Sequence, residues 1–209
     1  MIQGSLTKHG YAAPLSRPKA SRGFTLVELM VTVVIISVLA AIATPGILAR
    51  VNSYRTRSAA EMIASTYRLA RLRAMGRGSA VVVRYNAGVI TVLEGIQGSE
   101  SSAAGCQNLP APSCTTPATR FNSGSTDYQT IESYDVAYGG AYTLAASLGT
   151  VSDVCFTPLG RAYSRTSITG TFAQMLTPAT VSVTHSSGGL VRQVLVLPNG
   201  TARVTAGAL

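Results

Sequence analysis

The sequence predicts an α+β protein: a long N-terminal helix, apolar enough to span a membrane, followed by a mostly antiparallel β domain, here called the head. Three observations lead to this class. The 209-residue chain contains an apolar run at residues 24–44 that holds one charge. A pattern with helical spacing continues to about residue 78, and short β-branched segments separated by Gly, Pro and Asn turns follow it. Four parts are expected: a leader at 1–23, two helix halves at 24–45 and 46–78, and the head at 79–209.

The leader is basic and fixes the expected orientation. It contains Lys8, Arg17, Lys19 and Arg22 and no acid, so it supplies a large share of the formal net charge of +9. Basic flanks of a membrane-spanning helix stay in the cytoplasm. We therefore expect a single pass, with the N-terminus in the cytoplasm and everything after about residue 46 outside it.

The apolar run carries one acidic residue, Glu28, close to its start. A charged side chain at the bilayer centre costs about 2.5–3.5 kcal/mol, and less near an interface, so this carboxylate requires a cationic partner. Cleavage between Gly23 and Phe24 would create an amino group four residues away on the same helix face. Glu28 would then neutralise the amine of its own chain or of a neighbouring parallel helix. The alternative is a secretory signal peptide cut near residues 41–43, although the apolar centre of such peptides is shorter, about 7–15 residues.

The N-terminal segment has a recognisable pattern: Gly23, then Phe24 to Glu28 reading FTLVE, the apolar run, and Pro45. This pattern resembles the N-terminus of type IV prepilins and type II secretion pseudopilins. The resemblance implies cleavage after Gly23 by a prepilin peptidase, N-methylation of Phe24, and use of Glu28 in assembly with other pilins or pseudopilins. It also implies an inner-membrane protein with a periplasmic head that enters a pilus or pseudopilus.

The second helix half follows Pro45, which removes a backbone hydrogen bond and permits a kink. The helix is expected to end at residues 76–78. Its arginines, opposed by Glu61 as the one acid of this half, are expected to face solvent and to contact lipid headgroups near residues 50–57. Contact with a partner or with nucleic acid is the alternative. An apolar stripe is expected to pack on the head, formed by Val51, Tyr54, Met62, Leu69 and Leu72.

The head is expected to begin with a hairpin of strands 79–85 and 89–94. Residues 95–130 are rich in Gly, Ser, Thr and Pro and are expected to form a long loop, closed by a disulfide between Cys106 and Cys114 if the head is exported. Cys155 is then expected to be buried and unpaired. Further strands are predicted at 131–138, 141–147, 151–156, 180–184, 190–197 and 201–205.

Two further segments resemble the GspH/FimT group of minor pilins and pseudopilins: CFTPLGR at 155–161 and VLVLPNGTARV at 194–204. The resemblance implies a minor subunit that primes or caps a filament, in a type IV pilus by narrow preference, or in a type II secretion or competence filament. Some relatives bind DNA, which here would involve Arg161, Arg192 and Arg203. Those relatives end in Gly-Arg-Val-Arg, whereas this sequence has one arginine, Arg203, at the corresponding place. DNA binding is expected to be weaker because fewer phosphate contacts are available.

The sequence offers no constellation for catalysis, and we expect neither an enzyme nor a cofactor. There is no phosphate loop and no paired-carboxylate motif, and His185 is the one histidine after the leader. A nucleophile pair of Cys155 or a serine with His185 lacks any surrounding signature. A zinc site of the three cysteines and His185 is also disfavoured, because the spacings match no common zinc pattern, so we predict no metal.

Overall fold

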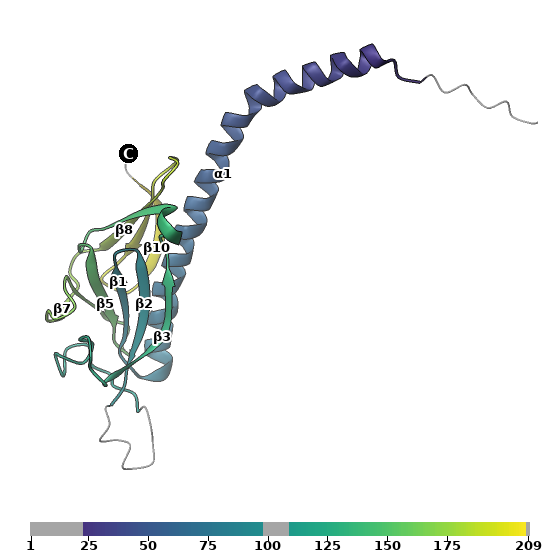
Figure 1. Ribbon diagram of the computed structural model, residues 1–209. Coiled ribbons are helices and arrows are strands. Elements are labelled where there is room, and N and C mark those ends of the chain that lie inside the picture. The colour runs from purple at the N-terminus through teal and green to yellow at the C-terminus, as the bar shows by residue number, and fades with distance from the viewer. Residues whose placement is uncertain (1–22, 98–108, 208–209) are drawn as a thin grey trace, which may run out of the picture. The chain divides into compact units, whose positions relative to one another are not determined.

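The computed structural model describes residues 23–97 and 109–207 (Figure 1). The chain divides into two compact units, with the boundary between Ala43 and Thr44. In the described part of the chain, the first unit contains the start of one helix and the three residues before it. The second contains the rest of that helix and all the strands.

The helix α1 (Leu26–Arg77) has 52 residues and continues through Pro45. Thr25 caps its start, because the backbone N–H of Glu28 donates to Thr25 Oγ1 over 3.2 Å. Gly78 ends it with a φ of 69°, and its N–H donates to the carbonyl of Ala74 over 3.1 Å. The predicted end at residues 76–78 is confirmed, and the predicted kink at Pro45 stays a prediction.

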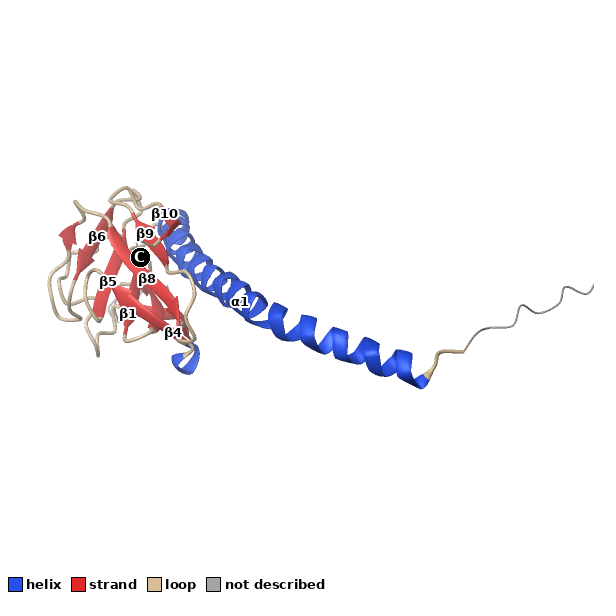
Figure 2. Ribbon diagram, turned by 90° about the horizontal axis from the view of Figure 1, so that it is seen from above, coloured by secondary structure: helices blue, strands red, loops and turns tan. Residues whose placement is uncertain are grey.

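The strands form two antiparallel sheets, which lie on one side of α1 in both views (Figures 1 and 2). The larger sheet has the order β3-β2-β1-β5-β6-β7, and the smaller one β10-β9-β8-β4. The α+β class with an antiparallel head is confirmed. The strands are β1 (Val81–Asn86), β2 (Val89–Gly95), β3 (Tyr128–Asp135), β4 (Tyr142–Ala146), β5 (Val151–Phe156), β6 (Ala162–Arg165), β7 (Ala173–Gln174), β8 (Ala179–His185), β9 (Arg192–Val196) and β10 (Ala202–Ala206), with a 3-10 turn η2 (Tyr138–Gly140) before β4.

The predicted hairpin is confirmed as β1 and β2, joined by Ala87 and Gly88. Both turn residues have positive φ, 46° and 95°, as a two-residue hairpin turn requires. Strand β3 begins three residues before the predicted start at 131. Strands β6 and β7 were not predicted, because they are short and carry polar residues inside them.

The face of α1 that packs on both sheets is not the predicted stripe. Leu69 and Leu72 are 62% and 60% exposed, Tyr54 and Val51 are exposed as well, and Met62 is only half-buried. Small side chains let a sheet approach the helix backbone, whereas large ones would hold it away. The buried helix face is mostly alanine: Ala59, Ala60, Ile63, Ala64, Tyr67, Ala70 and Ala74.

A second cluster of buried side chains lies on the far face of the larger sheet, and there the disulfide prediction is wrong. Cys114 is bonded to Cys155, with a Cα–Cα distance of 6.0 Å, and Cys106 lies outside the described residues. Cys155 is paired in register with Val82, and both belong to this cluster rather than to the core under α1. The loop that carries Cys114 packs there, with Phe121 buried beside it. Cys155 is therefore buried in a strand, as expected, but not unpaired.

Replacing Cys155 by serine is expected to destabilise the head. The bond closes a loop with a sequence separation of 41 residues, and losing such a cross-link costs roughly 2–4 kcal/mol. Urea unfolding of the full chain in detergent, followed by near-ultraviolet circular dichroism, measures this cost. Cys106→Ser is the matched control and should leave the midpoint unchanged. Equal losses in the two variants would contradict the Cys114–Cys155 assignment.

Candidate functional site

The N-terminal half of α1 is exposed around its whole circumference. Described side chains from Leu26 to Leu48 are all exposed, and Leu26, Ile36 and Ile42 are examples at 73%, 65% and 73%. Over 18 residues the mean hydropathy is 2.7, and none of this stretch is buried. This is the one helix in the described part of the chain that is long and apolar enough to cross a membrane. Such a surface requires lipid or other protein around it.

The polar groups inside this stretch are satisfied within the helix. The hydroxyl groups of Thr32 and Ser37 each donate to the carbonyl three residues earlier, over 2.8 Å. Backbone groups are paired by the helix itself, except that Pro45 has no N–H to donate to the carbonyl of Ala41. The stretch therefore meets the requirement for an apolar medium, with one charged exception, the carboxylate of Glu28.

Glu28 lies in the first turn of α1, three residues after the capping Thr25. A carboxylate there is favoured by the positive end of the helix dipole. Within the described residues, the Glu28 side chain is exposed and makes no ion pair. The expectation that Phe24 shares a helix face with Glu28 is not met, because the helix begins at Leu26 and Phe24 lies before it, 79% exposed. Gly23, the other residue of the predicted cleavage site, is exposed too.

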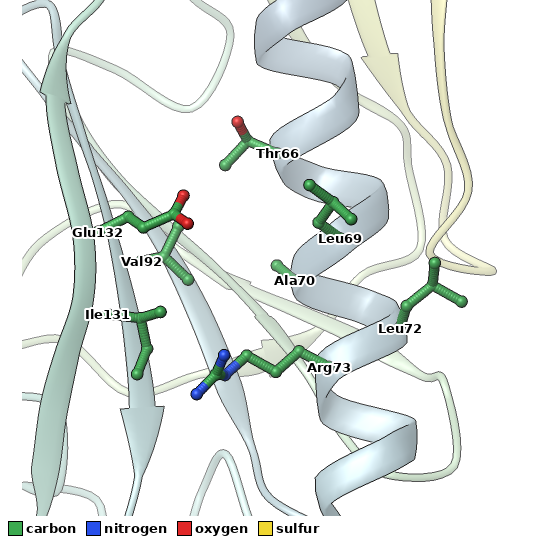
Figure 3. Close-up of a pocket in the computed structure, with 8 residues that line it drawn as sticks. All are labelled: Thr66, Leu69, Ala70, Leu72, Arg73, Val92, Ile131 and Glu132. Carbon is green, nitrogen blue, oxygen red and sulfur yellow. The ribbon is translucent and has the colours of Figure 1, made fainter.

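The other candidate surface is the outer side of α1 within the second unit. Leu69, Leu72 and Met75 are spaced by three residues and are 62%, 60% and 48% exposed. Beside them, a groove of about 300 Å³ separates α1 from β2 and β3 (Figure 3). The residues that line it are Thr66, Leu69, Ala70, Leu72, Arg73, Val92, Ile131 and Glu132. This is an apolar groove with a charged end.

The charged end of the groove is an ion cluster around Glu94, whose side chain is 1% exposed. Arg73 and Arg77 donate from their Nε atoms to the two carboxylate oxygens over 2.7 and 2.9 Å. Burial alone would raise the pKa of Glu94. The hydrogen bonds and charges of Arg77 and Arg73 outweigh it and hold that pKa below its ordinary value. The cluster fastens the last turns of α1 to β2.

Because the pKa of Glu94 is lowered on folding, its contribution to stability is present above the unfolded value, about 4.3, and is lost as the pH falls through the folded value. Glu94→Gln is expected to lower the free energy of unfolding near neutral pH by about 1.5–3 kcal/mol and to reduce its decline at acidic pH. Urea unfolding at several pH values measures both effects. Glu132→Gln, at an exposed site on β3, should change neither, and an unaltered acid decline in Glu94→Gln would contradict this role.

The two segments that resemble the GspH/FimT group meet in the structure. Gly160 and Gly200 form turns with φ of 75° and 79°, and a Cβ on Gly200 would lie 2.9 Å from the carbonyl oxygen of Gly160. Arg71 of α1 reaches both turns, and such a Cβ would also lie 2.9 Å from its Nε atom. Arg68, one helix turn earlier, donates from Nε to the carbonyl of Ala202 over 2.8 Å. The helix arginines were expected to face solvent, so these contacts of Arg68 and Arg71 with the head were not predicted; their spacing of three residues was the available signal.

The three arginines predicted to contact DNA do not share one face. Arg203 is exposed on β10 and pairs in register with Leu195. Arg192 shares the alternating positions of the buried Val194 and Val196 along β9, so its side chain is on the same face of the smaller sheet as theirs. Arg203 pairs with Leu195 and is on the other face. Arg161 is exposed in the turn before β6. Arg192 and Arg203 therefore do not form one surface on the smaller sheet.

The nucleophile pair of Cys155 and His185 is not assembled. Cys155 is in a disulfide on β5 of the larger sheet, whereas His185 is on β8 of the smaller one. His185 accepts a hydrogen bond at Nδ1 from the N–H of Ser187 over 3.1 Å, and its ring contacts Tyr142 edge-on. Among residues 23–97 and 109–207, no group of three His, Cys, Asp or Glu side chains is placed to hold a metal ion.

Comparison with known protein families identifies one motif, at the N-terminus of the chain. The family model of the prokaryotic N-terminal methylation motif matches residues 18–44, which confirms the resemblance of the N-terminal segment. No curated protein matches the chain significantly. The type IV minor pilin FimU of Pseudomonas aeruginosa strain PAO1 is 15% identical, over 74% of this chain and 90% of that one, with a TM-score of 0.44. The minor pseudopilin EpsH of the type 2 secretion system of Vibrio cholerae is 16% identical, over 72% and 96%, with a TM-score of 0.40.

Proposed function

We propose that this protein is a minor pilin that primes or caps a type IV pilus through its N-terminal helix. The observation that carries the proposal is the helix stretch from Leu26 to Leu48, which is exposed on all sides and overlaps the methylation motif at residues 18–44. A surface of this kind suits two environments in turn, the bilayer and a bundle of similar helices. The chain moves from the first to the second without refolding the helix.

Processing prepares the N-terminus for the bundle. A prepilin peptidase cleaves after Gly23, and Phe24 receives an N-methyl group. The new amine remains cationic, and it lies at the end of α1 where Glu28 is exposed without an ion pair in the described part of its own chain. In a bundle of parallel helices, Glu28 neutralises the Phe24 amine of a neighbouring subunit. This pair sets the axial position of one subunit against the next, because an unpaired charge in an apolar medium is costly.

The outer face of α1 extends the contact into the periplasmic head. Leu69, Leu72 and Met75 are exposed on the same helix that carries the apolar stretch. Subunits that associate along this helix would cover these side chains and the adjoining groove. The use of alanine on the inner face and leucine on the outer face supports this role, since large apolar side chains without a partner are typical of interaction surfaces.

A minor pseudopilin of a type II secretion system is the alternative, because it uses the same N-terminal chemistry. DNA binding for natural transformation is less favoured, since Arg192 lies on the opposite sheet face from Arg203. Cross-linking of the native envelope followed by mass spectrometry tests the proposal. Peptides around Leu72 joined to a major pilin and other minor pilins are expected. Cross-links to secretion pseudopilins alone would replace the pilus with a secretion pseudopilus, and cross-links to neither would overturn filament assembly.

A further inference from the structure

A group of aromatic and basic side chains, all exposed except the half-buried Tyr142, lies where α1 first meets the strands, and the assembly role described above does not use it. We call it the rim: Arg50, Tyr54, Arg55 and Arg57 of α1, Tyr138 of η2, and Tyr142 of β4. The turn between β8 and β9 lies close by, because a Cβ on Gly189 would be 3.7 Å from Asn52.

Tyr138 and Tyr142 of the rim form a connected row with His185. The ring of Tyr138 contacts that of Tyr142 edge-on, with centroids 5.7 Å apart, and Tyr142 contacts His185 in the same way at 5.3 Å. The hydroxyl of Tyr138 donates to Met62 Sδ over 3.4 Å. Tyr138, Tyr142 and Met62 line a groove of about 180 Å³ together with Tyr54 and Arg55. Aromatic faces and a guanidinium group therefore converge on one small site.

The loop that carries Tyr138 holds it outward in an unfavourable backbone conformation. Tyr138 has a φ of +47°, which is rare for a bulky residue, and its side chain is 55% exposed. The carboxylate of Asp135 accepts hydrogen bonds from the N–H groups of Ala137 and Gly139, over 2.8 and 2.9 Å. Strained backbone that is fixed by such contacts is concentrated at functional sites.

The basic side chains of the rim have no opposing acid along the helix. Between Glu28 and Glu61 the sequence contains Arg50, Arg55 and Arg57 but no aspartate or glutamate. Among the described residues, none of these three arginines makes an ion pair, and all are exposed. The rim is therefore a cationic surface, and it is complementary to an anion.

Chain connectivity keeps the helix part of the rim near the membrane, however the two units are oriented. Arg50 to Arg57 follow the end of the apolar stretch at Leu48 by two to nine residues, at most about 14 Å of helix. The headgroup layer extends roughly 5–8 Å beyond the hydrocarbon core, and arginine side chains reach several ångströms back toward it. Tyrosine concentrates at this depth, and arginine there is attracted to anionic lipids.

We propose that the rim is a binding surface for the phosphate groups of anionic phospholipids, which holds the head against the bilayer until the subunit leaves the membrane. Arg55 contacts the lipid phosphate, and Tyr54 lies at the boundary between headgroups and acyl chains. This inference rests on the membrane anchoring proposed above. It names lipid as the occupant because the rim follows directly on the membrane-spanning stretch and carries the charge that such lipid attracts.

The chain contains no tryptophan, so Tyr54→Trp provides a single fluorescent reporter. The full chain is placed in nanodiscs of phosphatidylcholine, with or without phosphatidylglycerol, using lipids brominated near the carbonyl end of the acyl chain. With phosphatidylglycerol, we expect blue-shifted emission and about twofold quenching, both reduced by Arg55→Gln with Arg57→Gln. Tyr138→Trp is the second reporter, and its quenching should be weaker, because Tyr138 contacts Met62, about 12 Å further along α1 than Tyr54.

Two matched controls separate the rim from the rest of the surface. Leu159→Trp, 81% exposed in a turn next to Gly160, reports from near Arg71, about 25 Å further along α1 than Tyr54, and should not be quenched. Arg203→Gln removes an exposed arginine elsewhere and should leave the quenching unchanged.

The other outcomes overturn the inference in distinguishable ways. A chain that enters nanodiscs but shows equal emission with both lipid mixtures retains its anchor and lacks the lipid site. Emission that changes with the number of copies per nanodisc, rather than with the lipid, would make a second copy the occupant. A chain that does not enter nanodiscs at all would remove the anchoring proposal and this inference together.

Discussion

Glu28→Ala is expected to remain in the membrane but to enter filaments roughly ten to a hundred times less than the unaltered chain. Without Glu28, the Phe24 amine of the adjacent subunit stays unpaired in an apolar bundle. A charge left in that setting costs about 2.5–3.5 kcal/mol at the most buried depth, and 1.4 kcal/mol corresponds to a factor of ten. Quantitative immunoblotting of sheared filaments against the membrane fraction measures the change.

Two controls assign the effect to the charge. Glu28→Gln keeps the shape of the side chain but removes the negative charge, and it should lose incorporation as Glu28→Ala does. Glu61→Gln removes the acid on α1 that pairs with Arg68 over 3.8 Å at the surface, and it should behave as the unaltered chain. If Glu28→Gln still entered filaments at normal levels, hydrogen bonding or shape rather than charge would explain the residue.

Asp153→Ala is expected to destabilise the head by about 3–5 kcal/mol, the cost of leaving buried charges without their partner. Asp153 is fully buried on β5 and accepts from Arg84 over 2.9 Å and from Arg165 over 2.7 Å. Arg165 also donates to the carbonyls of Phe121 and Gly170, so this cluster fastens two loops to the larger sheet. Urea unfolding of the full chain in detergent gives the free-energy change.

The matched control for Asp153→Ala is Asp135→Ala, at an exposed carboxylate that holds the η2 loop. It should cost much less, since its hydrogen bonds are made at the surface. An equally small loss for Asp153→Ala would mean that the buried arginines find other partners. That result would contradict the role assigned to the cluster.

The helix and the hairpin were predictable because local signals determine them. Thr25 and Gly78 mark the two ends of α1, and the turn at Ala87 and Gly88 fits the alternation of the flanking strands. The orientation of the helix was not predictable in this way. Large apolar residues dominate a count of hydrophobic spacing, whereas the packing against two sheets selected alanines.

The disulfide and the basic residues near the C-terminus depended on tertiary structure. Cys114 is eight residues from Cys106, so a disulfide that closes a short loop was the simpler expectation. In the structure, β5 places Cys155 on the face of the larger sheet away from α1, where the loop with Cys114 packs. The contact of Arg71 with Gly160 and Gly200 joins three segments that are distant in sequence. No local pattern encodes such a meeting, although the two glycine turns were recognised individually.

The most direct test of the central claim is the intact mass of the protein isolated from the cell envelope, with sequencing of its N-terminal peptide. The account predicts a chain that begins at Phe24, lacks residues 1–23 and carries one methyl group on its N-terminal amine. This chain retains the whole apolar helix, including Glu28 and Pro45. A chain that begins after Ala43, as a secreted protein would, or that retains the leader, would contradict it.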